Sequence, residues 1–320
     1  MATPPPPITG ITWRPATDAD IPSIVELSRA VYEAEGIDEA GGPMFWEWWL
    51  GEHDREADTI LAVDSDGTAW ALGGSYGTIT GTGTRAILWF DSHPGRLDLE
   101  APLLAWTIDR GRQQVGGPPG ADRVIRISVE EHRNRRRSLL EESGFVATRS
   151  FVKMKRSLAA DLPDLRPVPD GVTVLPWTAD LDESARLVSN TAFADHWGSL
   201  PMDSATWGSM IMDDDVVRRD LSFVAVSNGE AVAVCLGEVD PEEDAELLYI
   251  SRVGTVPGWQ RRGLASLLLT HSLHAAAAAG LSASALSVDE ESRFDATAVY
   301  TGLGYRAESR TINYVLEDRS

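Results

Sequence analysis

The same order of predicted elements occurs twice along this chain, once before and once after residues 157–171. That stretch contains three prolines and no sustained hydrophobic period, so it predicts a linker. In each half a short strand and an acid-capped helix come first, followed by two strands joined by a glycine-containing turn. A strand leading into a long helix, a further strand, a short helix and a last strand complete the half. A duplicated order of elements predicts two tandem domains that share one fold.

The boundaries of these elements follow from the hydrophobic pattern. The first half has predicted strands at 11–15, 59–63, 69–76, 85–90 and 123–129 and a long helix at 99–114. The second half has predicted strands at 172–177, 222–226, 231–238, 246–256 and 283–288 and a long helix at 263–279. Because turns join the early strands and helices join the later ones, each half predicts a mixed, mostly antiparallel sheet flanked by helices. The chain is therefore predicted to be an α/β protein with a mixed sheet of the α+β kind, with domains at 1–156 and 172–320.

Length and composition restrict the class of protein. The 320 residues suit two domains, each large enough to bury a core of its own. No apolar run approaches the roughly 18 residues of a membrane span. Residues 1–7 also lack the basic region and apolar stretch of a signal peptide. We therefore expect a cytoplasmic protein with no membrane partner.

Charge and cysteine content exclude further classes. The net charge of -21 argues against a nucleic-acid partner, because nucleic-acid phosphates require a basic surface. The acidic excess lies mainly in residues 161–320, which suits either solubility or the attraction of a cationic amine. Cys235 is the single cysteine, so an internal disulfide and a cysteine-based zinc site are excluded. Its apolar neighbours predict a buried structural thiol.

The loop at 255–266 carries the most chemical information. It reads Thr-Val-Pro-Gly-Trp-Gln-Arg-Arg-Gly-Leu-Ala-Ser and lies between a predicted strand and a long apolar helix. Backbone N–H groups at a helix start lack partners, and the aligned peptide dipoles place partial positive charge there. A diphosphate can dock on these groups where the chain permits close approach, as small residues do. The residues predicted to form this anion site are Gln260, Arg261, Arg262, Gly263, Leu264, Ala265 and Ser266.

The pattern Val-Pro-x-x-Gln-x-x-Gly-x-Ala resembles the acetyl-CoA pyrophosphate loop of the GNAT superfamily of acyltransferases. Residues 288–300, followed by Gly304 and Tyr305, are similar to the second CoA segment of that family, with Ser292 where the family usually has Asn. The resemblance implies acetyl-CoA as co-substrate and no metal. It also implies that the pantetheine arm pairs with the backbone of Val253, Gly254 and Thr255.

The same resemblance assigns a catalytic role to Tyr300. Family members use a tyrosine at this place as a general acid that protonates the departing CoA thiolate. A phenol with an ordinary pKa of about 10 keeps its proton at neutral pH, so it can serve in this way. The alternative is a core tyrosine whose hydroxyl lies at the surface.

The first half does not reproduce this loop. Alignment of the two halves puts Glu100 in place of Gly263 and Leu140 in place of Tyr300, and a carboxylate at that position repels a diphosphate. Residues 1–156 therefore predict a degenerate GNAT-like domain, and residues 172–320 predict a GNAT domain with the acetyl-CoA site. The basic run 133–137 predicts a solvated helix face, with phosphate binding as the alternative.

The acceptor side is less well specified. Asp195 is predicted to pair with an amine, and His196 and Trp197 are predicted to shape or stack on the substrate, although such residues are more often structural. The tandem layout is similar to that of mycothiol synthases, but two acceptor-side positions differ. Tyr249 stands where that family has a strand Glu, and Ser287 stands where it has a Tyr.

The general base is therefore not the usual one. Many GNAT members place a Glu on the strand that enters the pyrophosphate loop, and those positions are Tyr249 and Ser251 here. An amine must lose a proton to attack, so another acceptor of that proton is required. Glu238 and Asp289 are the best substitutes that the sequence offers.

The first functional hypothesis is transfer of an acetyl group from acetyl-CoA to a primary amine of a small molecule, by direct attack in a ternary complex. A second is a CoA-binding or scaffolding protein without turnover. A third keeps the enzyme but changes the acyl group to a longer one, or the acceptor to a hydroxyl group or a protein N-terminus. We expect a monomer or a homodimer.

Overall fold

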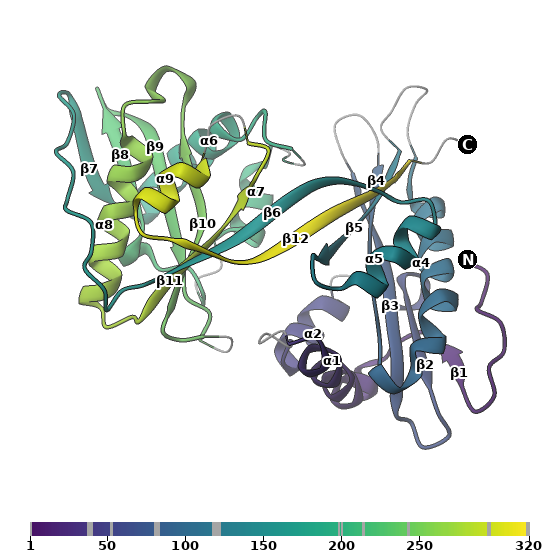
Figure 1. Ribbon diagram of the computed structural model, residues 1–320. Coiled ribbons are helices and arrows are strands. Elements are labelled where there is room, and N and C mark those ends of the chain that lie inside the picture. The colour runs from purple at the N-terminus through teal and green to yellow at the C-terminus, as the bar shows by residue number, and fades with distance from the viewer. Residues whose placement is uncertain are drawn as a thin grey trace. The chain divides into compact units, whose positions relative to one another are not determined.

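The computed structural model describes residues 2–36, 41–51, 54–79, 84–116, 123–197, 199, 201–212, 215–241, 244–292 and 296–317 (Figure 1). The chain divides into two compact units. The first unit contains residues 1–148 together with 312–320, and the second contains residues 149–311. None of the described helices combines the length and the apolar character that a membrane crossing needs.

The first unit is a mixed sheet with helices on both faces. Its strands are β1 (Thr12–Arg14), β2 (Thr59–Val63), β3 (Ala69–Ile79), β4 (Thr84–Ser92) and β5 (Val124–Glu130). They lie in sequence order, and the end of β12 (Arg306–Glu317) lies next to β5. The helices are η1 (Asp18–Asp20), α1 (Ile21–Glu35), α2 (Pro43–Gly51), α3 (Arg55–Asp58), η2 (Pro94–Leu99), α4 (Glu100–Gln114) and α5 (Asn134–Glu142).

Alternating side chains of this sheet form two cores. On β2, Ile60 and Ala62 pack with α4, whereas Leu61 and Val63 pack with α1 and α2 on the opposite face. All five residues of β2 are buried, as expected for a strand that is covered on both faces. Ile312 and Tyr314 of β12 complete the core on the α4 side. The end of the last strand, from Ile312 onward, therefore belongs to the first unit.

The second unit repeats this architecture. Its strands are β6 (Val146–Ser157), β7 (Val172–Pro176), β8 (Phe223–Ser227), β9 (Glu230–Glu238), β10 (Leu247–Thr255) and β11 (Ala283–Asp289). Their order is β6-β11-β10-β9-β8-β7, and the one parallel pair among these described strands is β10 with β11. The helices are η3 (Ala179–Leu181), α6 (Asp182–Ala192), α7 (Ser204–Met210), η4 (Arg219–Leu221), η5 (Pro257–Trp259), α8 (Leu264–Ala278) and α9 (Ala296–Gly302). The predicted fold class, a mixed and mostly antiparallel sheet flanked by helices, is confirmed.

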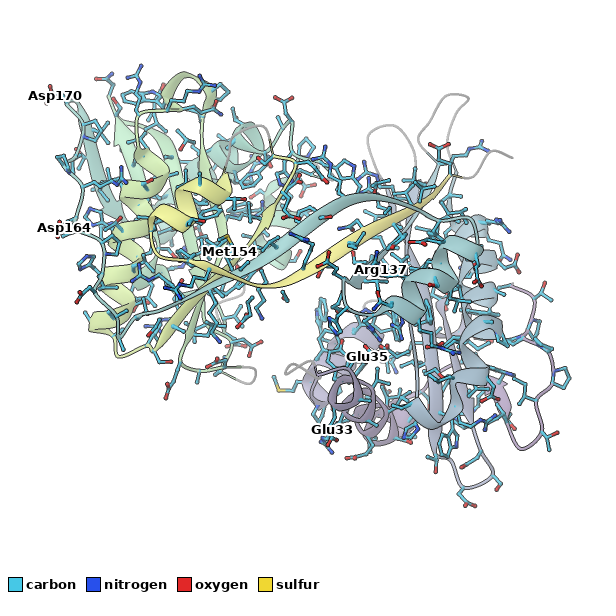
Figure 2. The ribbon with its side chains drawn as sticks, in the orientation of Figure 1. Glu33, Glu35, Arg137, Met154, Asp164 and Asp170 are labelled. Atoms are coloured by element: carbon cyan, nitrogen blue, oxygen red, sulfur yellow. The ribbon has the colours of Figure 1, made fainter. Side chains whose placement is uncertain are left out.

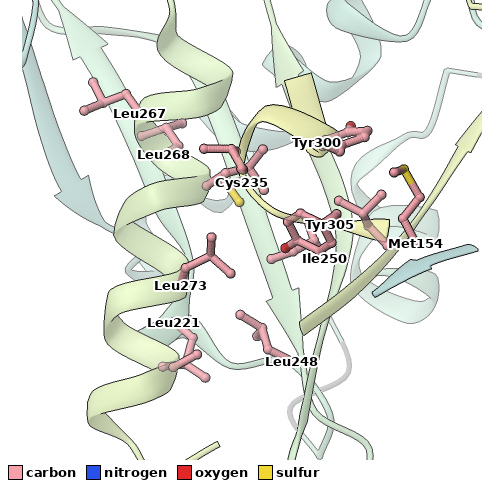
Figure 3. Packing of buried hydrophobic residues seen from close by; sticks show 14 of the residues in the cluster. Met154, Leu221, Cys235, Leu248, Ile250, Leu267, Leu268, Leu273, Tyr300 and Tyr305 are labelled. Atoms are coloured by element: carbon pink, nitrogen blue, oxygen red, sulfur yellow. The ribbon is translucent and has the colours of Figure 1, made fainter. Parts of the chain in front are cut away.

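The core on the α8 side of this sheet holds the aromatic residues that the site depends on. Leu267, Leu268 and Leu273 of α8 pack against Leu248 and Ile250 of β10, and Tyr300 and Tyr305 lie beside Ile250 (Figure 3). Cys235 is buried in this core, as predicted, and burial raises the pKa of its thiol to about 12. The thiol therefore stays protonated and takes no part in nucleophilic chemistry at neutral pH.

The units do not follow the predicted boundaries at 1–156 and 172–320. Residues 158–171 contain neither helix nor strand, but they belong to the second unit together with residues 149–157 of β6. Seven residues of β6, from Phe151 to Ser157, pair with β11. Hydrophobic pattern alone places β6 at the end of the first half, because the pattern cannot say which sheet a closing strand joins.

The basic run at 133–137 differs from the solvated face that its composition predicts. Arg133 and Arg136 are buried, and both donate hydrogen bonds to Asp91 at the end of β4. Arg133 also pairs with Glu130 and with Glu35, which Figure 2 labels at the end of α1. Three carboxylates around one guanidinium group meet the requirement that buried charges be paired.

We expect removal of the Arg133 charge to destabilise the protein strongly. In Arg133→Met, Asp91, Glu130 and Glu35 lose their shared cation, and breaking a buried ion pair in this way costs about 3–5 kcal/mol. Urea unfolding followed by circular dichroism measures the loss. The control is Arg96→Met, which breaks an exposed pair with Asp98 and should change stability by about 1 kcal/mol or less. Equal effects of the two substitutions would contradict the assignment.

Candidate active site

The second unit contains a cavity of about 640 Å³ where β10 and β11 separate. Their parallel pairing runs from Leu247 with Ala283 to Ile250 with Leu286, and it stops there. Beyond this point β10 continues to pair with β9, and β11 continues to pair with β6. Among the described residues, the edge of β10 that faces β11 therefore has no strand partner from Ser251 onward. Such an edge accepts an extended ligand that forms main-chain hydrogen bonds.

A bulge in β10 marks the start of this separation. Ile250 pairs with Gly237 and Arg252 with Leu236, so Ser251 is the extra residue. The hydroxyl group of Ser251 is buried and has no hydrogen-bond partner among the described residues. The bulge bends the strand and moves the following residues away from the regular ladder.

The loop before α8 presents a row of backbone donors. Among the described residues, no group accepts a hydrogen bond from the N–H of any residue from Arg261 to Ser266. The first helical bond of α8 runs from the N–H of Leu267 to the carbonyl of Gly263 at 2.9 Å. These amides and the positive end of the helix dipole form a site for an anion.

The backbone of this loop explains the glycine. Gly263 has a φ of 80°, and Arg261 has a φ of 61°, both in the left-handed region that non-glycine residues rarely adopt. A Cβ on Gly263 would meet no atom within 4 Å, so the space beside it is open. The glycine is thus required for its conformation and leaves room beside the amides. These features fit a diphosphate group.

Most of the residues predicted for the site line this one cavity. They are Asp195, His196, Trp197, Val253, Gly254, Thr255, Gln260, Arg261, Gly263, Leu264, Ala265, Ser266, Ser287, Asp289, Ser292 and Tyr300. Arg262 does not line it, and its guanidinium group lies 4.5 Å from the centroid of the Trp259 ring. Glu238 and Tyr249 also lie outside the lining and form a cross-strand pair.

Tyr300 lies on α9 with its ring in the core and its side chain in the cavity wall. The ring is edge-on to that of Tyr305 at 6.2 Å, and no described residue forms a hydrogen bond with its hydroxyl. Burial raises the pKa of the Tyr300 phenol above its ordinary value, and the nearby Cys235 adds to the shift. The phenol therefore keeps its proton throughout the neutral range and is available as a donor.

Asp289 ends β11 at the cavity and is held in one orientation. Its Oδ1 accepts a hydrogen bond from the N–H of Glu291 at 3.0 Å, and its Oδ2 accepts one from Arg149 at 2.8 Å. The side chain is 2% exposed. Asp289 is thus a fixed carboxylate whose charge is partly balanced by Arg149.

The wall beside Asp289 is aromatic. The rings of His196 and Trp197 each lie 6.3 Å from the ring of Phe151, and the ring of Phe193 lies 5.5 Å from that of His196. Phe151 lies on β6, whereas the other three rings follow the end of α6, where Gly254 of β10 makes close contact with the helix. The arrangement gives an apolar surface next to the charged groups of β11.

Glu238 faces a different environment from the cavity. Arg252 lies between the rings of Phe193 and Trp207, at 5.6 and 5.7 Å from their centroids, and donates a hydrogen bond to Ser189 of α6. Burial lowers the pKa of Arg252, and the negative charge of Glu238 opposes this effect. Glu238 therefore interacts with a half-buried cation on the α6 side of the sheet.

The corresponding place in the first unit is filled by side chains of the chain itself. Glu100, the first residue of α4, is buried, and its carboxylate accepts a hydrogen bond from Arg135 at 2.6 Å. Arg135 also donates to the carbonyl of Leu97. A carboxylate thus lies in the first turn of the helix, where an external anion would otherwise be attracted. Leu140, at the position of Tyr300, is fully buried and has no polar group.

Several lining residues were not predicted. Arg149, Phe193, Trp259 and Glu291 line the cavity. Trp259 and Glu291 lie within the loop at 255–266 and the segment 288–300 that the sequence singled out, and Phe193 lies two residues before Asp195, so their neighbourhood was the available signal. Arg149 gave no signal, because it belongs to a strand that the sequence assigns to the first half.

Residues 187–305 match the model of the acetyltransferase (GNAT) family. The region covers the cavity residues of β10, α8, β11 and α9. The second unit therefore carries a GNAT acetyltransferase domain, and the enzyme class inferred from the loop is confirmed.

Relatives with similar sequences include mycothiol acetyltransferases. The chain is 27% identical over 301 residues to that of a Nocardioides species, covering 88% of this chain and 92% of the relative. It is 27% identical over 342 residues to that of Frankia alni, covering 96% and 95%. A third, from Frankia casuarinae, is 33% identical over 189 residues, covering 53% and 52%.

Solved structures show the same fold. A GCN5-related N-acetyltransferase from Sphaerobacter thermophilus has a TM-score of 0.80 at 24% identity, covering 97% of this chain and 96% of that one. A tandem GNAT protein from the clavulanic acid biosynthesis pathway has a TM-score of 0.70 at 13% identity, covering 96% and 98%. The tandem layout inferred from the repeated elements is thus confirmed.

We expect the contact between β10 and α6 to be sensitive to added volume. In Gly254→Ala the new Cβ would lie 2.8 Å from the Cβ of Ala192 and 3.1 Å from Cε2 of Phe193, so the helix end must move. Such overpacking costs about 1–3 kcal/mol. The control is Gly258→Ala, whose Cβ would meet nothing within 4 Å. Urea unfolding of both variants checks this, and equal stability of the two would show that the close contact is unimportant.

Proposed function

We propose that the protein transfers an acetyl group from acetyl-CoA to a primary amine of a small molecule, in a ternary complex at the cavity of the second unit. One observation carries this proposal. The unpartnered edge of β10, the row of free amides before α8 and the Tyr300 hydroxyl all border the same cavity. Each suits a different part of the co-substrate, namely the pantetheine arm, the diphosphate and the sulfur atom.

The binding of CoA follows from the backbone. Amides of residues 261–266 bind the diphosphate, and Gln260 orders the loop by donating from Nε2 to the carbonyl of Thr255 at 3.2 Å. Val253, Gly254 and Thr255 offer main-chain groups to the pantetheine arm. Ser292 follows the turn capped by Asp289 and lines the cavity, so its hydroxyl is available to the arm.

The reaction comprises four events, and exchange of protons with water returns Tyr300 and Asp289 to their starting states after each turnover. The amine nitrogen attacks the thioester carbonyl carbon and forms the new C–N bond, and collapse of the intermediate breaks the C–S bond. Tyr300 gives its proton to the departing thiolate sulfur, which becomes the free thiol of CoA. The amine gives up a proton to Asp289, directly or through water, because Asp289 lines the cavity whereas Glu238 does not. Much of the rate enhancement comes from holding the two reactants close together and from N–H dipoles that are fixed toward the developing negative charge.

The acceptor is proposed to be a small molecule that bears an amine. Asp195 and Asp289 give the cavity negative charge, and Trp197 gives it an aromatic wall. The full-length relatives are named mycothiol acetyltransferases. The substitutions at Tyr249 and Ser287 mean that the acceptor of those relatives is not carried over to this chain.

Release of free CoA from acetyl-CoA, measured with a thiol reagent across a panel of primary amines, tests the proposal. Amine-dependent release with formation of the N-acetyl product supports it. Tight binding of acetyl-CoA without turnover of any amine, alcohol or peptide N-terminus would overturn it in favour of a CoA-binding scaffold.

We predict that acetyl-CoA binds once per chain. The amides before α8 are free, whereas Glu100 already occupies the equivalent turn of α4. Gly263→Glu should abolish binding, because the new side chain enters the open space beside the amides and repels the diphosphate. Glu100→Gly should leave the stoichiometry at one site, since Leu140 still stands at the position of Tyr300. Isothermal calorimetry measures both, and two equivalent sites in the wild type would refute the prediction.

We predict that Tyr300→Phe lowers kcat by about 10- to 10⁴-fold, the scale of a lost general acid. The phenylalanine ring preserves the packing against Tyr305, so acetyl-CoA affinity and folding should change little. The loss appears only where negative charge builds on sulfur. Steady-state kinetics and calorimetry separate the two effects. A kcat within about twofold of wild type would mean that Tyr300 is a packing residue and that water or the amine itself supplies the proton.

A further inference from the structure

Arg149 borders the acceptor part of the cavity, although no motif points to it. It lies on the segment of β6 that belongs to the second unit. Its Nη1 donates a hydrogen bond to Oδ2 of Asp289 at 2.8 Å, and its Nε lies 3.9 Å from Oε2 of Glu291. Its guanidinium carbon lies 5.8 Å from the centroid of the Trp197 ring. The group is therefore held between a carboxylate and an aromatic face.

Most of the hydrogen-bonding capacity of Arg149 is unused. A guanidinium group carries five N–H donors, and the described residues engage one nitrogen, Nη1, by a hydrogen bond. The side chain is 28% exposed and lines the cavity. The hydrogen bond to Asp289 already fixes the position of the side chain. Little entropy is therefore lost when its other N–H donors bind a ligand. Their natural partners are oxygen atoms.

We propose that Arg149 binds an oxygen atom of the acceptor and thereby determines which amines are acetylated. This inference rests on the proposed function and adds the chemical class of the acceptor. The oxygen belongs to an uncharged group, a hydroxyl or a carbonyl, because Asp195, Asp289 and Glu291 also line the cavity and disfavour a further carboxylate. The acceptor is thus an amine with a neutral, oxygen-bearing neighbour.

A purely structural role for Arg149 makes a different prediction. If Arg149 served only to orient Asp289, its loss would impair proton removal from every amine to the same degree. If it binds an acceptor oxygen, its loss impairs only those amines that carry such an oxygen. A matched pair of substrates therefore separates the two roles.

The experiment compares oxygen-bearing amines with oxygen-free amines of the same skeleton, for wild type and Arg149→Gln. 2-Aminocyclohexanol with cyclohexylamine, and 2-aminopropane-1,3-diol with isopropylamine, are such pairs. We expect the ratio of kcat/KM values within a pair to favour the oxygen-bearing member in the wild type. In Arg149→Gln we expect this ratio to fall about tenfold, the effect of one lost hydrogen bond to a charged group. The fall should lie mainly in the acceptor KM.

Arg218→Gln is the matched control, because Arg218 pairs with the exposed Asp220 in the same unit and does not line the cavity. Acetyl-CoA affinity, measured by calorimetry, shows that each variant is folded. If Arg149→Gln reduces kcat/KM equally for both members of a pair, or resembles Arg218→Gln, the inference is wrong while the proposed function stands. If the wild type acetylates no amine, the proposed function falls, and the inference falls with it.

Discussion

The separation of β10 and β11 beyond Ile250 and Leu286 is the feature on which the site depends. Two parallel strands that remained paired would satisfy each other's backbone groups and leave no cavity. The bulge at Ser251 ends the pairing, and the unpartnered edge and the free amides before α8 then border the same space. Leaving backbone groups unpaired is costly for a buried segment, so an arrangement of this kind is typical of a site that a ligand completes. The core of α8, Tyr300 and Tyr305 holds that opening in place from one side.

The first unit has the same fold, but charged side chains of the chain itself lie at the start of its long helix. Its β4 and β5 also pair in parallel, and α4 occupies the place of α8. Here Glu100 and Arg135 form an ion pair at the start of α4, and Arg136 lies 4.5 Å from the ring of Phe90 while pairing with Asp91. Charged side chains of the chain itself thus pair with one another near the start of α4, the position that corresponds to the amides before α8.

Much of the fold could be predicted because its signals are local. The strand at 59–63 and the two long helices predicted at 99–114 and 263–279, which are α4 and α8, follow from patterns contained within each segment. The loop at 255–266 was identifiable because amides at a helix start, a glycine and small residues occur in one short stretch. The helices α2 and α7 were missed, since both are short, and α2 is dominated by tryptophans rather than by an amphipathic pattern. The burial of Arg133 and the role of Arg149 were out of reach, because each depends on carboxylates distant in the sequence, Asp91 and Asp289.

Residues 158–171 do not divide the chain into independent halves, because each unit contains a strand segment from the other half of the sequence. The second unit needs β6, which pairs with β11 over Phe151 to Ser157 and would otherwise leave that strand with an open edge. Arg156 of β6 is buried and donates hydrogen bonds to the carbonyls of Leu303 and Asp161, so it fixes the end of α9, the helix that carries Tyr300. The first unit in turn needs Ile312 and Tyr314 from the end of the chain for its core. Each unit thus takes its closing strand from the other half of the sequence, so removal of residues 1–156 would also remove most of β6 from the sheet of the second unit.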